Sequence, residues 1–400
     1  MEKVKIGIFG LWRGSSFIDI INNMEGAVIT AVCDRDKGKL DDALTHCPEE
    51  TKGFADFGEL LDSGIDAVML CNFFNEHAEC AIQAMERGIH VFSECTSAVT
   101  LHDCVRLCET VERTGCKYMI AENYPFSAAL LEFKHMVDGG TLGRILYAEG
   151  EYNHTCTRED LAALTPGKYH WRAWMPRTYY VTHTLGPLMH VTGQMPIKVS
   201  AFAVHSDVLE KYDDFRHNYD AFAMMNCITD GGALFRFTGC AAMASPSGYR
   251  VVGEYGSTET GRTLGGNVNV TYHNWTIPDG MEASQTYEPH WRENSELAAK
   301  AGHGGGDFWT VYNFVNYIRN GVEPFFNVYR GCAMSAVAIL GWRSCLENGK
   351  TYDIPDFRSI EQREKYRTDT LTPFPDANGN VTLPCAVTEE NIRRYEQAKR

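Results

Sequence analysis

The sequence of 400 residues lacks a long apolar run, and none approaches the ~20 residues that a membrane-spanning helix needs. It also lacks an excess of positive charge, since 52 acidic residues outnumber 37 basic ones and the net charge is −15. Such a charge argues against a surface for nucleic acid or anionic lipid. Room for a signal peptide is missing too, because the first predicted strand begins at Val4. We therefore expect a cytoplasmic protein that binds neither nucleic acid nor membrane.

The 14 cysteines show no paired spacing of the kind that binds zinc, so we expect no metal. In a reducing cytosol most of them are expected to be small buried hydrophobic residues. Cys104 and Cys108 stand four apart in a predicted helix and are expected to pack in a core. Internal repeats and low-complexity tracts are absent as well. The length suffices for two domains with substantial cores.

The first forty residues have the pattern of a dinucleotide-binding βαβ unit. Strand, glycine turn, helix, strand and acid follow one another at Val4–Phe9, Gly10–Ser16, Phe17–Met24, Val28–Cys33 and Asp34. Ser15 or Ser16 is expected to cap the helix. In such a unit the glycines let the backbone approach a pyrophosphate, and the acid binds the ribose hydroxyls.

The glycine pattern departs from G-x-G-x-x-G at two places. Trp12 stands where the second glycine is expected, and Gly14 comes one residue early for the third. The alternative without a cofactor is a βαβ unit of another α/β protein, in which Asp34 merely begins a loop. An aspartate here favours NAD because it repels a 2′-phosphate, while Arg35 keeps NADP open. The expected cofactor contacts from this region are Gly10, Trp12, Arg13, Gly14, Ser15, Asp34 and Arg35.

Residues 36–123 continue the alternation of strands and helices, which predicts a parallel, doubly wound sheet. Ligands of such sheets lie beyond the carboxyl ends of the strands. Four polar residues stand at or just after predicted strand ends: Asn72, His77, Glu94 and Glu122. We expect these side chains to lie near one crevice.

After Asn123 the predicted strands become longer. They are expected at Ile145–His154, Ile197–His205, Ala221–Thr229, Gly232–Ala241 and Tyr249–Glu254, with a hairpin turn at Asp230-Gly231-Gly232. Pro278–Ala301 is expected to be an irregular, loop-rich insertion. The predicted fold class is α/β, with a doubly wound parallel Rossmann sheet in residues 1–123 and an α+β domain in residues 124–355. The second domain has a large, mainly antiparallel open sheet, and residues 356–400 form a tail that wraps the surface. An open sheet needs cover, so a homodimer or homotetramer is expected.

Together these motifs resemble the glucose–fructose oxidoreductase, inositol dehydrogenase and rhizopine-catabolism family over nearly the whole chain. The segments that carry the resemblance include Ala84–Glu94, Gly140–Gly143 and Asn348-Gly349-Lys350. Most members are NAD(P)-dependent sugar or polyol dehydrogenases, with a Glu-Lys-Pro motif whose lysine assists proton transfer. Here the motif reads Glu94-Cys95-Thr96, and a cysteine cannot supply a fixed cation.

One branch of that family, the NAD-dependent glycoside hydrolases typified by α-N-acetylgalactosaminidases, also lacks the lysine. Further segments are similar to that branch: Glu122-Asn123, Glu151–His154, His170-Trp171-Arg172, Tyr180–Pro187 and Ala301–Asp307. The resemblance implies a carbohydrate substrate and a tightly held, recycled NAD⁺. Oxidation at sugar C3 acidifies the C2 proton, the aglycone leaves C1 by elimination, water adds and the hydride returns.

The resemblance also implies roles for particular residues. It assigns catalysis to His183, Tyr180, Tyr152 and Glu122. Places at the strand ends also predict cofactor contacts from Asn72, His77 and Glu94. The resemblance implies further cofactor contacts from Cys95, Asn123, Trp171 and Arg172, and substrate contacts from Asn153, His154, His303 and Asp307. Simpler interpretations stand beside these: Tyr152 as a core aromatic, His303 or Asp307 as a helix cap, and Cys95 as an inert small residue beside the nicotinamide.

Two other functions stay open. A sugar dehydrogenase that uses His183 alone as acid and base would accumulate NADH on a free sugar. A non-catalytic sensor of sugar and NAD would show a ligand-induced thermal shift without turnover. The combined presence of Tyr152, Tyr180, His183 and Glu122 argues against the sensor.

Overall fold

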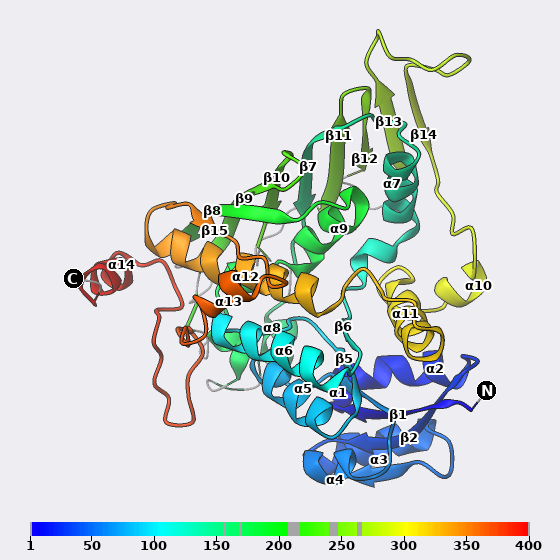
Figure 1. Ribbon diagram of the computed structural model, residues 1–400, viewed down its shortest axis with the longest axis vertical. Coiled ribbons are helices and arrows are strands. Elements are labelled where there is room, and N and C mark those ends of the chain that lie inside the picture. Colours follow the sequence, from blue (N-terminus) through cyan, green and yellow to red (C-terminus); the bar gives the residue numbers. More distant parts are fainter. Residues whose placement is uncertain are drawn as a thin grey trace. The chain divides into compact units, whose positions relative to one another are not determined.

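The structure, a computed structural model, describes residues 2–154, 157–165, 167, 170–206, 217–218, 220–239, 247–261 and 266–398 (Figure 1). The chain forms two compact units. The first comprises Met1–Phe126, Asn294–Cys332 and Phe357–Asp369, and the second comprises Ser127–Glu293, Ala333–Asp356 and Thr370–Arg400. Two segments that come late in the sequence thus pack with the N-terminal residues. Within the described residues no helix is both long and apolar enough to cross a membrane.

The first unit is built on a six-stranded sheet with the order β3-β2-β1-β4-β5-β6. The strands are β1 (Val4–Phe9), β2 (Ala27–Cys33), β3 (Lys52–Phe54), β4 (Ala67–Leu70), β5 (His90–Ser93) and β6 (Tyr118–Ile120). All neighbouring strands are parallel. The strand order reverses between β1 and β4, which is where ligands bind in doubly wound sheets. The predicted parallel sheet is confirmed.

The helices of this unit flank the sheet. They are α1 (Leu11–Gly14), η1 (Ser15–Phe17), α2 (Ile18–Asn22), α3 (Lys37–His46), α4 (Phe57–Leu61), η2 (Phe74–Glu76), α5 (His77–Glu86), α6 (Leu101–Thr114), η3 (Tyr124–Phe126), α10 (Ser295–Ala298), α11 (Gly306–Asn320) and α13 (Ile360–Glu364). Helix α6 shows how local sequence sets the ends. The hydroxyl of Thr100 accepts the backbone N–H of Asp103, and Gly115 ends the helix in the left-handed conformation.

The first helix begins earlier than the sequence predicts. Elements α1, η1 and α2 follow one another without a break from Leu11, directly after Gly10. The hydroxyl of Ser15 donates to the carbonyl of Leu11, four residues back, so Ser15 lies inside the helical run. The predicted cap at Ser15 or Ser16 is therefore wrong.

The second unit holds a nine-stranded sheet with the order β14-β13-β12-β11-β7-β10-β9-β8-β15. The strands are β7 (Ile145–Glu151), β8 (Pro196–His205), β9 (Asp220–Thr229), β10 (Leu234–Thr238), β11 (Gly248–Gly253), β12 (Gly256–Thr260), β13 (Val268–Tyr272), β14 (Ser284–Tyr287) and β15 (Tyr352–Asp353). Only the β7–β10 pair among them is parallel. The predicted α+β domain with a mainly antiparallel sheet is confirmed, as is the hairpin turn between β9 and β10.

The second unit also contains helices, of which α9 (Thr182–Thr192) packs against β7 and β10. Those of the second unit include α7 (Ala128–Asp138), α8 (Arg158–Leu164), η4 (Trp171–Ala173), η5 (Arg177–Tyr180), α9 (Thr182–Thr192) and α14 (Glu389–Ala398), while α12 (Val328–Leu346) contributes its residues from Ala333 onward. Strand β7 ends at Glu151, three residues short of the predicted end. Strand β14 and helix α10 lie where an irregular insertion is predicted, so that prediction is wrong for these residues. The tip of the predicted strand Gly232–Ala241 lies outside the described residues.

Candidate active site

The glycine turn after β1 is shaped by close backbone contacts. Gly10 has φ +90°, and a Cβ there would lie 2.5 Å from backbone atoms of Cys71 and Asn72. A Cβ on Gly14 would lie 2.5 Å from Cγ2 of Ile8, so this glycine lets the helix pack against β1. Gly14 thus has the packing role of the third glycine, one residue early. Trp12 is 62% exposed and does not fill the core behind the turn.

The acid at the end of β2 lies beside this turn. Oδ2 of Asp34 accepts the backbone N–H of Leu11 at 2.7 Å, and Oδ1 accepts that of Asp36 at 2.9 Å. The side chain of Arg35 is 73% exposed. The amide of Asn72 donates to Glu76, but its buried Oδ1 has no hydrogen-bond donor among the described residues. The glycine turn at Gly10, the fixed carboxylate of Asp34 and the unsatisfied Oδ1 of Asn72 fit a dinucleotide.

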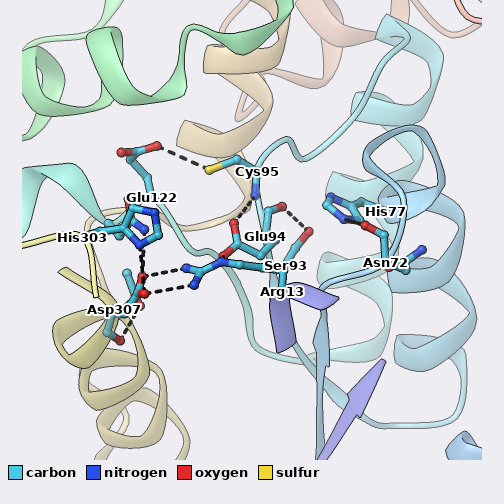
Figure 2. Close-up of polar contacts among 11 residues, drawn as sticks. Arg13, Asn72, His77, Ser93, Glu94, Cys95, Glu122, His303 and Asp307 are labelled. Carbon is cyan, nitrogen blue, oxygen red and sulfur yellow. Dashed lines mark hydrogen bonds and ion pairs between the residues drawn. The ribbon is translucent and has the colours of Figure 1, made fainter. Parts of the chain in front are cut away.

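The buried carboxylate of Asp307 accepts four hydrogen bonds within the same unit, and Figure 2 shows those from Arg13 and His303. Arg13 donates to both oxygens of Asp307, with Nη2–Oδ1 at 2.6 Å and Nη1–Oδ2 at 3.0 Å. Asn123 donates to Oδ1 at 2.8 Å, and Nδ1 of His303 lies 2.9 Å from Oδ2. The remaining Nε of Arg13 donates to Glu94 at 2.7 Å. These contacts join the first helix, the ends of β5 and β6, and the start of α11.

The charges of this network stabilise one another. Burial by itself raises the pKa of Asp307, but hydrogen bonds from His303 and Arg13 outweigh burial and bring the pKa well below its ordinary value. Burial lowers the pKa of Arg13, and the charges of Glu94 and Asp307 more than compensate, so that the pKa is raised. Arg13 and Asp307 therefore form a buried ion pair at neutral pH. Neither Asp307 nor His303 is a helix cap, because α11 begins after Gly305 without a side-chain cap.

The cysteine that replaces the lysine contacts the predicted catalytic glutamate (Figure 2). Sγ of Cys95 donates to Oε2 of Glu122 at 3.4 Å, and the backbone N–H of Tyr124 donates to Oε1 at 3.1 Å. Glu122 is fully buried. The backbone N–H of Cys95 donates to Oε2 of Glu94 at 3.1 Å. The two glutamates are thus linked through one residue.

His77 joins the ends of two neighbouring strands. Its Nδ1 lies 3.0 Å from the carbonyl of Thr96, and its Nε2 lies 3.3 Å from that of Asn72. Burial lowers its pKa in spite of these contacts, so the ring is neutral at pH 7 and donates to one carbonyl at a time. His77 therefore shapes the backbone beside the expected pyrophosphate position.

In the second unit three predicted catalytic side chains lie together. The ring centroids of Tyr152 and Tyr180 lie 4.9 Å and 5.1 Å from that of His183, both edge to face. The hydroxyl of Tyr249, on β11, donates to the backbone carbonyl of His183. A Cβ on Gly150 would lie 2.7 Å from the carbonyl oxygen of Thr184, so this glycine lets α9 approach β7. We name Tyr152, Tyr180 and His183 the tyrosine–histidine cluster.

Other residues implied by the resemblance surround this cluster. The guanidinium of Arg172 lies 4.5 Å from the ring centroid of Trp171 and 5.6 Å from that of Tyr180. The rings of His154 and Tyr152 are 6.0 Å apart. Partial desolvation and the charge of Arg172 lower the pKa of His154. The neighbouring residue Asn153 is held at the end of β7, because its backbone N–H donates to the hydroxyl of Ser247.

Two positioning residues were not anticipated from the sequence, Tyr249 and Gly150. A glycine inside a predicted strand signals a close backbone approach, and that signal could have indicated Gly150. Nothing in the sequence points to Tyr249. Within the described residues no group of three or more His, Cys, Asp or Glu side chains could hold a metal ion.

Comparison with known proteins finds two family models that match parts of the chain. Residues 4–122 match the oxidoreductase family with the NAD-binding Rossmann fold, and residues 248–363 match the C-terminal domain of glycosyl hydrolase 109. Glycosyl hydrolase family 109 protein 1 of Shewanella sp. (strain ANA-3) is 26% identical, covering 89% of this chain and 85% of the relative. The alpha-N-acetylgalactosaminidase of Shewanella oneidensis has the same identity and coverage. Levoglucosan dehydrogenase, solved with NADH and L-sorbose, shares the fold at 17% identity, with a TM-score of 0.75 over 89% of this chain and 100% of that one.

Residues 4–122 therefore form an NAD-binding Rossmann domain of the oxidoreductase family, and the chain is an enzyme that binds NAD(H). Residues 248–363 are similar to the C-terminal domain of glycosyl hydrolase 109. The resemblance stated from the motifs is confirmed.

Proposed function

We propose that this enzyme is an NAD-dependent glycosidase that oxidises its sugar at C3, eliminates the aglycone, adds water and reduces the sugar again. The observation that carries the proposal is the tyrosine–histidine cluster, which places two phenols edge-on to one imidazole. Such a group can remove a hydroxyl proton and a carbon-bound proton in turn. The relatives' glycosidase names support the same class of reaction.

Bound NAD⁺ would supply a hydride acceptor and later return the hydride to the sugar. The residues that fit it are Gly10 in the turn, Asp34 at the ribose, and Asn72, whose unsatisfied Oδ1 can accept from a hydroxyl or amide group of the cofactor. The carboxylate of Asp34 lies at the end of β2 and repels a 2′-phosphate, so we expect NAD rather than NADP. A cofactor that is regenerated in each cycle has no need to leave, and we expect it to be held tightly.

Different residues of the cluster remove the two protons of the sugar. His183 takes the C3 hydroxyl proton, with Tyr180 as its neighbour in the relay. A carbonyl at C3 then acidifies the C2 proton, which Tyr152 removes. Tyr249 and Gly150 keep His183 in place, because one holds its carbonyl and the other lets α9 lie against β7.

The replacement of the lysine favours this route over plain dehydrogenation. A dehydrogenase of the resembled family uses a fixed cation near the reacting hydroxyl. Here the thiol of Cys95 donates to Glu122 instead. Glu122 would then orient the sugar through its hydroxyl groups.

The surroundings of the enzyme can be proposed as well. Apolar side chains are exposed on β8, β9 and β10, at Phe202, Val204, Ile228 and Leu234. We expect a second copy of the chain to cover them in a homodimer or homotetramer. The twelve described cysteines form no disulfide with one another, which suits the reducing cytoplasm.

A screen of chromogenic glycosides, with and without added NAD⁺, tests the function. The relative's name makes 4-nitrophenyl α-N-acetylgalactosaminide the first substrate. We expect released aglycone, no net NADH absorbance, and solvent deuterium at C2 of the product sugar. Steady NADH formation on free sugar would instead identify a dehydrogenase, and binding without turnover would identify a sensor.

A variant tests the cluster itself. His183→Ala should abolish turnover while NAD still raises the melting temperature, because the imidazole acts on the sugar. His46→Ala, which changes an exposed histidine, serves as the control and should keep full activity. Unchanged turnover in His183→Ala would remove this residue from the mechanism.

A further inference from the structure

The proposed reaction needs a proton at a third place, the aglycone oxygen. In the elimination the C2–H electron pair forms the C1–C2 double bond, and the C1–O pair leaves with the aglycone. That oxygen must gain a proton, and the water that adds to C1 must lose one. The tyrosine–histidine cluster is already assigned to the protons at C2 and C3, so a separate group is required.

His303 has the geometry of such a group. It lies in a glycine-rich loop, with φ +53° at His303 itself and positive φ at Gly304 and Gly305. A non-glycine residue in this conformation is uncommon and marks a constrained position. The side chain of His303 is 38% exposed, whereas that of its partner Asp307 is 1% exposed. One end of the imidazole is thus anchored in the protein while the ring stays accessible.

The anchor determines which nitrogen can react. A carboxylate only accepts hydrogen bonds, so the 2.9 Å contact requires a hydrogen on Nδ1. Nε2 is then the nitrogen that takes or gives a proton. Asp307 cannot turn away, because Arg13 binds both of its oxygens (Figure 2). Asn123 also donates to Oδ1. An imidazole held by a buried carboxylate is the arrangement of a histidine that works as general acid and base.

Glu122 suits this task less well. It is fully buried, and the backbone N–H of Tyr124 and the thiol of Cys95 both donate to its oxygens. Both of its oxygens therefore already accept hydrogen bonds from within the protein. Compared with Arg13, Glu94 and Asp307, the side chain of His303 is the most exposed, at 38%.

We propose that Nε2 of His303 protonates the departing aglycone oxygen and deprotonates the water that replaces it, with Asp307 and Arg13 as its positioning residues. This inference rests on the proposed function. Arg13 then links two parts of the first unit: it lies in the helix of the cofactor turn, and its guanidinium fixes the carboxylate that orients His303. Arg13, which the sequence predicts to contact the cofactor, thereby orients a residue that acts on the substrate.

The test compares two leaving groups on one sugar. His303→Asn is the sharpest variant, because asparagine tolerates the left-handed conformation that the loop requires. We expect a ~10²–10⁴-fold loss of kcat/KM on a methyl glycoside, the range for general acid catalysis. On the 2,4-dinitrophenyl glycoside, whose leaving group needs no proton, the loss should be under about tenfold. His303→Gly gives a second variant at the same backbone conformation.

Positioning residues should change the same quantity in the same direction. Asp307→Asn keeps an acceptor for Nδ1 but removes the charge, and Arg13→Lys loses the two-point contact, so both should impair the methyl glycoside more than the dinitrophenyl glycoside. His135→Asn alters an exposed histidine that contacts Arg292 and should change neither. Equal losses on both glycosides would overturn the proposal, and so would the absence of any loss in His303→Asn and His303→Gly.

Solvent-deuterium exchange at C2 separates this inference from the proposed function. In His303→Asn the exchange should continue at the rate of the unaltered enzyme, since C2 is served by the tyrosine–histidine cluster. Exchange lost together with cleavage would mean that His303 acts before elimination and would refute its leaving-group role. Absence of exchange in the unaltered enzyme would refute the elimination route itself, and the inference with it.

Discussion

Replacing Arg13 by methionine tests the physical description of the buried network. The substitution keeps an apolar stem of similar length but removes the guanidinium. Asp307 then loses two charge-assisted hydrogen bonds, at 2.6 Å and 3.0 Å, and keeps those from Asn123 and His303. Because its side chain is 1% exposed, water cannot replace the lost donors.

The magnitude follows from breaking a buried ion pair on one side. Removing one partner of such a pair costs about 3–5 kcal/mol, since the other charge stays buried and uncompensated. Glu94 also loses a donor at 2.7 Å, but it is partly exposed and keeps the N–H of Cys95. We therefore expect the free energy of unfolding to fall by about 3–5 kcal/mol in Arg13→Met.

Urea unfolding followed by far-ultraviolet circular dichroism measures this loss. The matched control is Arg35→Met. The side chain of Arg35 is 73% exposed, and its Nη1 lies 4.0 Å from Oε1 of Glu76, so the ion pair is long and open to water. Such a surface change should stay within about 0.5 kcal/mol. Adding Asp307→Asn to Arg13→Met should recover part of the loss, because the buried charge is removed. A loss below about 1 kcal/mol in Arg13→Met would refute the description of a buried, mutually dependent pair.

Three further predictions concern pH, packing and the cofactor. The pKa of Asp307 is lowered in the folded state, so its contribution to stability is complete above about pH 4 and is lost as the pH falls further. In urea unfolding between about pH 4 and pH 2, the stability of Asp307→Asn should therefore depend less on pH than that of the unaltered enzyme. Gly150→Ala places a Cβ 2.7 Å from the carbonyl of Thr184, so α9 must shift; kcat should fall about 10²-fold in steady-state assays, and an unchanged kcat would contradict the positioning argument. Asp34→Ala should weaken NAD at least about tenfold in calorimetry without changing sugar affinity, and unaltered NAD affinity would reject its role at the ribose.

Elements with strong local patterns could be predicted from the sequence. The apolar runs of β1 and β2, the glycine turn and Asp34 follow one another within 34 residues, so one short segment contains the whole signal. The hairpin between β9 and β10 is equally local. The cap at Ser15 was wrong because a serine hydroxyl serves equally well at a helix start or bonded to a carbonyl four residues back. Strand β14 was missed because an edge strand with exposed, polar residues lacks apolar alternation.

The sequence by itself determined the fold class, the order of the elements and the types of residue at the ends of the strands, because each of these depends on neighbours within one helix or strand. Tertiary structure alone decided which of those residues act together. Arg13 and Asp307 are 294 positions apart, and the resulting ion pair depends on how α11 packs against the first helix of the same unit. Likewise, the approach of α9 to β7 at Gly150 fixes His183. Contacts of this kind depend on distance in space, and sequence patterns report only distance along the chain.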